Sequence, residues 1–231
     1  MNRSYVVTGG GRGIGRAIAE RLLAGDGAVV VLDRDDAALG WTSSHPAGGG
    51  VIALAGDGAD EAVTGRAADM AQEAGMLAGW VNNAAVFGDA WLHAVPARQV
   101  VDLINANLAL AVTGCATAVR RFLAAGAGGA IVNVSSHQAQ RAVRGALPYA
   151  TAKAAIEGLT RALAVDYGPH GIRVNAVALG SVATGRYQAF LAAQEPAAAA
   201  RADDQIRALH PLGQAGRPPR GRRRRPLPAL R

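Results

Sequence analysis

Six short, almost wholly apolar runs alternate with longer stretches of helical periodicity, and this alternation restricts the fold more than any other feature of the sequence. The runs lack the polar–apolar alternation of half-exposed strands, as expected for strands that are covered on both faces. Strands and helices in this order predict βαβ units with right-handed crossovers, and hence an α/β fold with a doubly wound parallel sheet of about six strands. The expected strands are 5–8, 29–32, 51–54, 79–83, 130–135 and 172–178, and the expected helices are 14–25, about 60–75, about 98–125 and 148–167.

Composition places the chain among ordinary soluble domains. Its 231 residues are 50% hydrophobic, which is enough to bury one sizeable core. The one cysteine, Cys115, excludes a disulfide within the chain and is expected to be a small buried side chain. The five histidines show no metal-ligand spacing, so no metal is predicted. No signal peptide and no apolar stretch of ~18 residues is evident, so we expect a cytoplasmic protein without a membrane partner.

The positive net charge is confined to the C-terminal segment. Of the 24 basic residues, seven are arginines between 217 and 231, and the remaining 17 are balanced by 17 acidic residues. We therefore predict one domain over 1–218 and a disordered Arg/Pro-rich tail over 219–231. Nonspecific binding of nucleic acid or an anionic membrane by this tail is the alternative, but no aromatic residue interleaves the arginines. No specific nucleic-acid partner is predicted.

A glycine-rich turn, TGGGRGIG at residues 8–15, follows the first expected strand and opens the first expected helix. Glycines allow a tight turn and close approach of a ligand, and free N–H groups at a helix start favour a pyrophosphate. The spacing differs from G-x-G-x-x-G, and Arg16-Ala17 stand where a P-loop requires Lys-Ser/Thr, which disfavours ATP chemistry. The turn indicates a dinucleotide site, with simple turn geometry as the alternative.

Asp33 ends the second expected strand, 18 residues after Gly15. A dinucleotide-binding fold places a carboxylate there to bind the ribose 2′-OH, and this carboxylate repels a 2′-phosphate. Arg12 and Arg34 favour the opposite choice, because either can pair with that phosphate. We weigh Asp33 more heavily and predict NAD as the preferred cofactor, with NADP possible.

Lys153 is the only lysine among the 24 basic residues, and it follows Tyr149 by four positions on an expected helix. This spacing places both side chains on one face. A free phenol titrates near ~10, and a nearby ammonium lowers that pKa by favouring the phenolate. The pair therefore predicts a general acid/base for an alcohol or a carbonyl, and chance spacing is the alternative.

These motifs together resemble the classical short-chain dehydrogenase/reductase family over about residues 4–218. The resemblance rests on segments spread along the chain: TGGGRGIG (8–15), Asp57 after the third strand, VNNAA (81–85), ANLAL (106–110), NVSS (133–136), YATAK (149–153) and RVNAVALGSVAT (173–184). It implies a Rossmann-type sheet and hydride transfer between a nicotinamide cofactor and the alcohol or ketone carbon of a small organic substrate.

The resemblance also implies roles for single residues. Tyr149 is expected to be the acid/base, and Lys153 is expected to lower its pKa and to bind the nicotinamide ribose. Ser136 is expected to hydrogen-bond the substrate oxygen, and Asn107 to hold a water of the proton relay. The implied cofactor contacts are Gly9, Arg12, Gly13, Ile14, Gly15, Asp33, Asp57, Gly58, Asn83, Ala84, Ala85, Tyr149, Lys153, Val182 and Thr184.

Further expectations follow from the family pattern. Residues 181–210 are expected to form the substrate loop, and helices 98–125 and 148–167 to pair across a homodimer. Ala85 and Leu179 are mild departures, standing where the family has glycine and proline. The large departure from the family pattern is the Arg/Pro-rich sequence after residue 217. This sequence cannot supply the usual seventh strand, and it suggests a reading-frame shift. The sixth strand would then be an open sheet edge.

Two rival interpretations stay open. The first is a catalytically weak dinucleotide-binding protein, and the second is an unstable truncated member of the family.

Overall fold

The computed structural model describes residues 2–25 and 27–216, so the predicted tail at 219–231 and the frame shift lie outside the described residues. The described residues form six strands: β1 (Arg3–Thr8), β2 (Ala28–Asp33), β3 (Val51–Ala55), β4 (Met76–Asn82), β5 (Gly129–Ser136) and β6 (Ile172–Leu179). They also form six α-helices: α1 (Gly13–Leu23), α2 (Glu61–Ala74), α3 (Ala97–Ala125), α4 (Leu147–Tyr167), α5 (Gly185–Ala192) and α6 (Pro196–Ala208).

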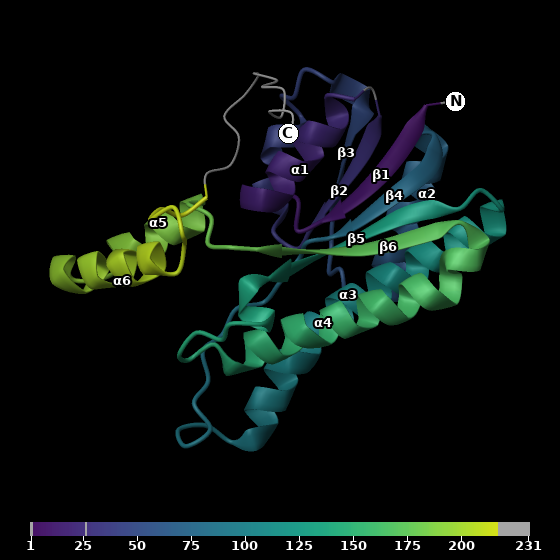
Figure 1. The fold of residues 1–231 in the computed structure, drawn as a ribbon. Helices are drawn as coiled ribbons and strands as arrows, with labels where there is room; N and C mark the ends of the chain where they lie inside the picture. The colour runs from purple at the N-terminus through teal and green to yellow at the C-terminus, as the bar shows by residue number, and fades with distance from the viewer. Residues whose placement is uncertain (1, 26, 217–231) are drawn as a thin grey trace, which may run out of the picture. The chain divides into compact units, whose positions relative to one another are not determined.

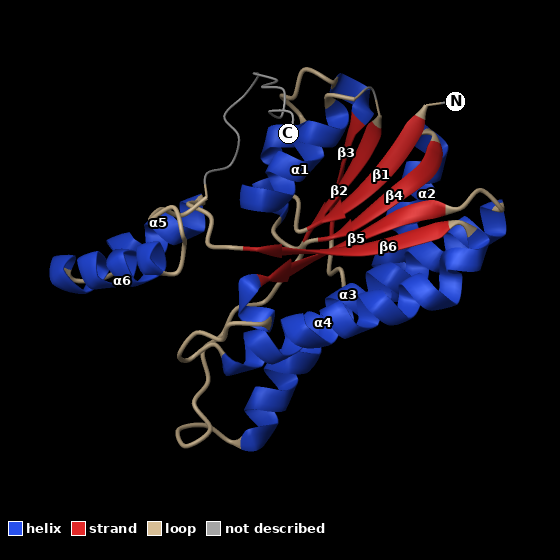
Figure 2. Cartoon of the chain, viewed as in Figure 1, coloured by secondary structure: helices blue, strands red, loops and turns tan. Residues whose placement is uncertain are grey.

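The strands make one parallel sheet in the order β3-β2-β1-β4-β5-β6 (Figures 1 and 2). This confirms the predicted doubly wound α/β fold with six strands. The strand order reverses direction between β1 and β4, and in such sheets ligands bind at the carboxyl ends of the strands beside this switch point.

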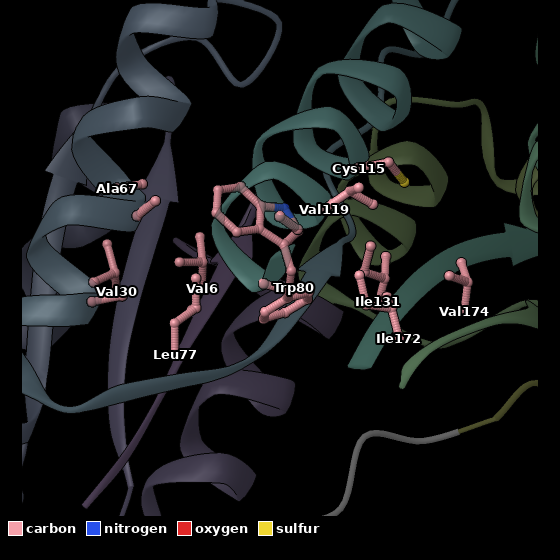
Figure 3. Close-up of a cluster of buried hydrophobic side chains, with 14 residues drawn as sticks. Val6, Val30, Ala67, Leu77, Trp80, Cys115, Val119, Ile131, Ile172 and Val174 are labelled. Carbon is pink, nitrogen blue, oxygen red and sulfur yellow. The ribbon is translucent and has the colours of Figure 1, made fainter. Parts of the chain in front are cut away.

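The alternation of side chains along the strands divides the core between the two faces of the sheet. On one face, Val6, Val30 and Ile131 pack beneath α2, α3 and α4. Trp80 lies at the centre of this layer and is fully buried (Figure 3). On the other face, the alternate strand residues Val7, Val29 and Val31 pack against α1. Because both faces are covered, the strand sequences are almost wholly apolar.

The β6 strand pairs with β5 alone among the described residues. Ile172 and Val174 at its start are buried, but Ala176, Val177 and Ala178 are exposed. The described part of the sheet therefore ends at β6, and the expectation of an open sheet edge there stays a prediction, because the segment after 217 lies outside the described residues.

The described residues divide into two compact units, one of residues 1–180 and one that begins at Ser181. The first unit holds the whole sheet. The second holds α5 and α6, two helices in a segment that the sequence analysis expected only as a substrate loop. The domain boundary at 218 stays a prediction.

Helix α3 is long and apolar enough to cross a membrane by length and composition alone, so the expectation that no apolar stretch reaches ~18 residues was wrong. In this fold α3 packs against α2, α4 and β4, and Val119 and Phe122 on its inner face are buried. Both faces of the sheet need an apolar covering, so the composition of α3 is that of a core helix.

A row of buried polar side chains joins β4, β5 and α4 beneath the apolar layer. Trp80 Nε1 donates to Asn82 Oδ1 at 2.9 Å, and Asn82 Nδ2 donates to Asn133 Oδ1 at 2.9 Å. Asn133 Nδ2 in turn donates to Thr160 Oγ1 of α4 at 2.9 Å. Buried amides are costly unless they are paired, so this row fixes α4 against the strands that it crosses.

Gly114 allows α3 to lie against this polar row, and it yields a test of the packing. A Cβ at Gly114 would stand 2.0 Å from Asn82 Oδ1. Gly114→Ala should therefore lower the free energy of unfolding by about 1–3 kcal/mol, because the helix must move away from β4. Gly65→Ala in α2, where nothing lies within 4 Å of the added Cβ, is the matched control. It should stabilise the protein by roughly 0.5–1 kcal/mol. Urea unfolding measures both, and equal effects of the two substitutions would contradict the packing.

Candidate active site

The glycine-rich turn closes tightly between β1 and α1. Gly9 has φ 63° and Gly13 has φ 57°, values that favour glycine. A Cβ at Gly15 would stand 2.1 Å from the Gly9 carbonyl oxygen, so any side chain there would open the turn. No side chain caps the N-terminus of α1, and no acidic residue lies in its first turn. The first N–H groups of α1 are therefore suited to a ligand phosphate.

Thr8 and Asn83 fasten this turn to the carboxyl end of β4. Asn83 Nδ2 donates to the carbonyl oxygens of Thr8 at 3.1 Å and Gly9 at 2.9 Å. Thr8 Oγ1 accepts from the N–H groups of Asn83 and Ala84, each at 3.1 Å. The half-buried Ala84 and Ala85 are thereby held beside the turn. The structure thus brings together the predicted cofactor contacts of 9–15 and 83–85.

Asp33 ends β2 and Asp57 follows β3 at the same edge of the sheet. Asp33 Oδ2 accepts from the Gly11 N–H at 2.9 Å, which joins the end of β2 to the glycine-rich turn. Asp57 is exposed, and its Oδ1 accepts from the Ala59 N–H at 2.9 Å. Gly58 is buried, and an added Cβ there would stand 3.9 Å from Thr8 Cβ. The predicted ribose and adenine residues therefore adjoin the turn.

Charged residues of the loop between β1 and α1 and of the loop after β2 also meet there. The Arg12 guanidinium forms an ion pair with Asp35, two residues beyond Asp33. Asp35 caps the 3₁₀-helix η1 (Asp36–Thr42) through the Ala38 N–H at 3.3 Å. The sequence analysis did not assign any role to Asp35.

Tyr149 and Lys153 lie one turn apart at the start of α4. Lys153 is only 2% exposed, and its Nζ donates to the Val134 carbonyl oxygen at 2.7 Å. The same Nζ lies 5.4 Å from the centroid of the Tyr149 ring. Burial lowers the pKa of Lys153 to about 8, which still leaves the amine largely protonated at pH 7. The helix therefore places a buried ammonium beside a phenol, as the i, i+4 spacing predicted.

Two further contacts fix α4 on β5 along the same helix face. Ser135 Oγ donates to Glu157 Oε1 at 2.9 Å, one turn after Lys153. Asn133 reaches Thr160 in the next turn. Contacts from three successive strand residues, 133 to 135, thus meet α4 at 153, 157 and 160. They set the register of the helix that carries Tyr149.

Ser136 ends β5 and is 7% exposed. Its Oγ accepts from the Gln138 N–H at 3.2 Å, whereas Ser135 turns to α4, as expected for adjacent residues on a strand. Gln138 Oε1 is buried and has no hydrogen-bond partner among the described residues. Ser136 therefore lies on β5, two residues after Val134, whose carbonyl oxygen accepts the hydrogen bond from Lys153.

Asn107 is buried on α3 and clamps the loop after β4. Its Oδ1 accepts from the Val86 N–H at 3.0 Å, and its Nδ2 donates to the Val86 carbonyl oxygen at 2.8 Å. The next residue, Phe87, stacks on Tyr149 with ring centroids 4.8 Å apart and planes at 22°. Phe87 was missed by the sequence analysis, because no periodicity marks a loop side chain that packs on a ring far along the chain. Asn107 thus supports Tyr149 through this loop.

The last two predicted cofactor residues, Val182 and Thr184, lie in the second unit. Val182 forms a bridge with Gly216, and the Thr184 side chain caps α5. Their role toward a cofactor stays a prediction.

The described residues do not group three His, Cys, Asp or Glu side chains in a way that could hold a metal ion. Cys115 is buried, and burial raises its pKa to about 11. It therefore remains a neutral thiol at pH 7, as expected of a small core side chain.

The fold and the site define a dinucleotide-binding α/β protein. The glycine-rich turn without room for a Cβ, the uncapped start of α1 and the carboxylate at the end of β2 all fit an adenine dinucleotide. The buried ammonium of Lys153 lies beside the Tyr149 phenol on α4, in the crossover between β5 and β6.

Known proteins with similar sequences and structures agree with this class. Residues 3–195 match the family described as short chain dehydrogenase. Over 182 residues the chain is 41% identical to the short-chain reductase protein NovJ of Streptomyces niveus, covering 78% of this chain and 69% of that protein. It is 35% identical to 2-(R)-hydroxypropyl-CoM dehydrogenase of Xanthobacter autotrophicus, covering 80% and 76%. A Beutenbergia cavernae structure with bound NADP superposes with a TM-score of 0.79 at 32% identity, covering 94% and 84%.

The chain therefore belongs to the short-chain dehydrogenase family. It is an NAD(P)-dependent oxidoreductase that acts on the alcohol or ketone group of small molecules. Its fold is the Rossmann-type fold of its structural neighbours and is consistent with a soluble protein.

The buried Lys153 predicts a specific dependence of stability on pH. Because its pKa falls from 10.5 to about 8 on folding, the unfolded chain holds a proton between these pH values that the folded chain lacks. The free energy of unfolding should therefore rise with pH across this window, by up to about 3 kcal/mol. Urea unfolding of the wild type and of Lys153→Met at several pH values isolates this contribution as a difference. A difference that is flat or falls from pH 8 to 10.5 would contradict the buried position of the amine.

Proposed function

We propose that Tyr149 is the catalytic acid/base of this oxidoreductase and that Lys153, Ser136 and Asn107 support it. The observation that carries this proposal is the buried Lys153 ammonium, 5.4 Å from the Tyr149 ring and held by the Val134 carbonyl. A cation held at this distance in a partly dry site favours the phenolate form of Tyr149. The phenol is then matched to proton transfer near neutral pH.

In this proposal each residue has a distinct task. When an alcohol is oxidised, its hydroxyl proton passes to the Tyr149 Oη, and when a ketone is reduced the phenol returns a proton to the carbonyl oxygen. Ser136 Oγ hydrogen-bonds the same substrate oxygen and holds it within reach of Tyr149. Asn107 supports the proton relay from Lys153 and fixes the loop that carries Phe87. A bound nicotinamide supplies the hydride acceptor or donor.

The cofactor is held in this proposal by three groups of residues. Gly9, Arg12, Gly13, Ile14 and Gly15 form the pyrophosphate turn. Asp33, Asp57 and Gly58 receive the adenosine, and Asn83 to Ala85, Tyr149 and Lys153 adjoin the nicotinamide ribose. For Val182 and Thr184, contact with the carboxamide and pyrophosphate stays the expectation that the family resemblance gives.

NAD is proposed as the preferred cofactor, because Asp33 adjoins the glycine-rich turn through Gly11. Its two oxygens accept only from the N–H groups of Gly11 and Asp35 among the described residues. Acceptor capacity remains on both oxygens for ribose hydroxyls, whereas a 2′-phosphate offers two further negative charges and no matching donor.

The proposed assembly is a cytoplasmic homodimer formed by α3 and α4. These helices pack side by side in the first unit and expose apolar side chains that an ordinary monomer surface would not favour, among them Val101, Val112 and Val165. An isologous interface across both helices would cover them.

The decisive experiment is a screen of secondary alcohols and ketones with NAD and NADP in parallel, followed by Tyr149→Phe on the best substrate. The phenol oxygen is the proton carrier, so its removal should lower kcat by at least about 100-fold while NAD⁺ affinity changes less than about twofold. Tyr167→Phe, at the other end of α4, is the matched control and should retain full turnover. A Tyr149→Phe variant with normal kcat would contradict the assignment.

The same preparations separate the rival interpretations. A wild-type protein that binds NAD⁺ without turning over any compound would favour the catalytically weak dinucleotide binder. A thermal melt without any cooperative transition, with or without NAD⁺, would favour the unstable product.

A further inference from the structure

Arg12 is a residue type that favours NADP, although it lies in a site whose Asp33 carboxylate favours NAD. An arginine in the glycine-rich turn can pair with a 2′-phosphate, and this one is 67% exposed at the side chain. In the structure, however, its guanidinium is engaged by the Asp35 carboxylate, which comes from the loop after β2. The cation that would favour NADP is thus already bound to an anion of the same chain.

The Asp35 carboxylate is held in place by the backbone around it. Its Oδ1 accepts from the Ala38 N–H at 3.3 Å and caps η1. The Asp35 N–H donates to Asp33 Oδ1 at 3.0 Å, so both carboxylates belong to one turn. Asp33 faces Gly11 and Asp35 faces Arg12, the next residue along the glycine-rich turn. One short segment therefore presents two carboxylates to two adjacent positions of that turn.

The charged residues at the end of β2 and in the glycine-rich turn, here called the corner, do not together favour binding of a phosphate. Asp33, Asp35 and Asp36 contribute three negative charges, and Arg12 and Arg34 contribute two positive charges, which leaves a net charge of minus one. Within the described residues Arg34 forms no ion pair, but it is flanked by Asp33 and Asp35 in the sequence. Removing the Asp35 charge would bring the corner to neutrality and release the Arg12 donors at the same time.

We propose that Asp35 is a second determinant of cofactor specificity, which disfavours NADP by holding the Arg12 guanidinium away from the 2′-phosphate. This inference rests on the proposed function, because it requires the adenosine end of the cofactor to lie at Asp33. Asp33 binds the ribose of NAD, and Asp35 withholds the one arginine of the turn that would otherwise bind NADP.

The test is the affinity of Asp35→Asn for NAD⁺ and NADP⁺, measured by calorimetry without any substrate. Asparagine keeps an oxygen for the Ala38 N–H and so preserves η1, but it no longer holds a guanidinium by charge. NADP⁺ affinity should rise about fivefold, the size of an exposed Arg–anion pair, while NAD⁺ affinity changes less than about twofold. The gain should shrink in high salt.

Two further variants assign the effect to Arg12. The double variant Asp35→Asn with Arg12→Ala should lose the NADP⁺ gain, because the released cation is gone. Asp36→Asn removes an equal charge from the next residue, which makes no ion pair with the described residues, and should change the NADP⁺/NAD⁺ ratio less than about twofold. An unchanged ratio in Asp35→Asn, an equal gain in Asp36→Asn, or a gain that survives loss of Arg12 would each overturn the inference.

Binding of the dinucleotides by the wild type distinguishes a failure of the proposed function from a failure of this inference. A wild-type protein that binds neither dinucleotide would contradict the proposed cofactor site and the inference with it. A wild type that binds NAD⁺, with no change of ratio in Asp35→Asn, would contradict the inference alone.

Discussion

A buried ammonium held against a strand carbonyl is the interaction on which the rest of the site depends. Lys153 Nζ meets the Val134 carbonyl oxygen at 2.7 Å in a position that is almost closed to water. An isolated charge there would be expensive, and its pKa falls for that reason. The cost is tolerable because a chain of polar contacts, from Trp80 through Asn82 and Asn133 to α4, fixes the helix that carries the lysine.

The same principle of fixed, paired polar groups operates at the cofactor end of the sheet. Thr8 and Asn83 hold the glycine-rich turn against β4, and Asp33 holds it against β2. Asn107 then fixes Val86 and with it Phe87, whose ring covers Tyr149. The sheet thus supplies a rigid edge, and short polar side chains transmit its geometry to the reacting groups.

The sequence predicted the elements of the first unit and the local pairs well, because both leave short-range patterns. The six strands followed from short apolar runs, and the four helices of the first unit and the Tyr149–Lys153 spacing followed from the helical period of 3.6 residues. Contacts between distant loops carry no such signal, so the Phe87–Tyr149 stack and the Arg12–Asp35 pair were not foreseen. Helices α5 and α6 were missed because their alanine-rich sequences lack a strong apolar stripe.

The ionisation of Tyr149 tests most directly whether Lys153 makes this phenol a proton carrier. Ultraviolet difference titration of the wild type against Tyr149→Phe, repeated in a Lys153→Met background, reports the pKa of this one phenol. The pKa of Tyr149 should be lower with Lys153 present than in the Lys153→Met background, because the ammonium favours the phenolate. Identical titration of Tyr149 in both backgrounds would contradict the claim that the buried amine makes this phenol a proton carrier.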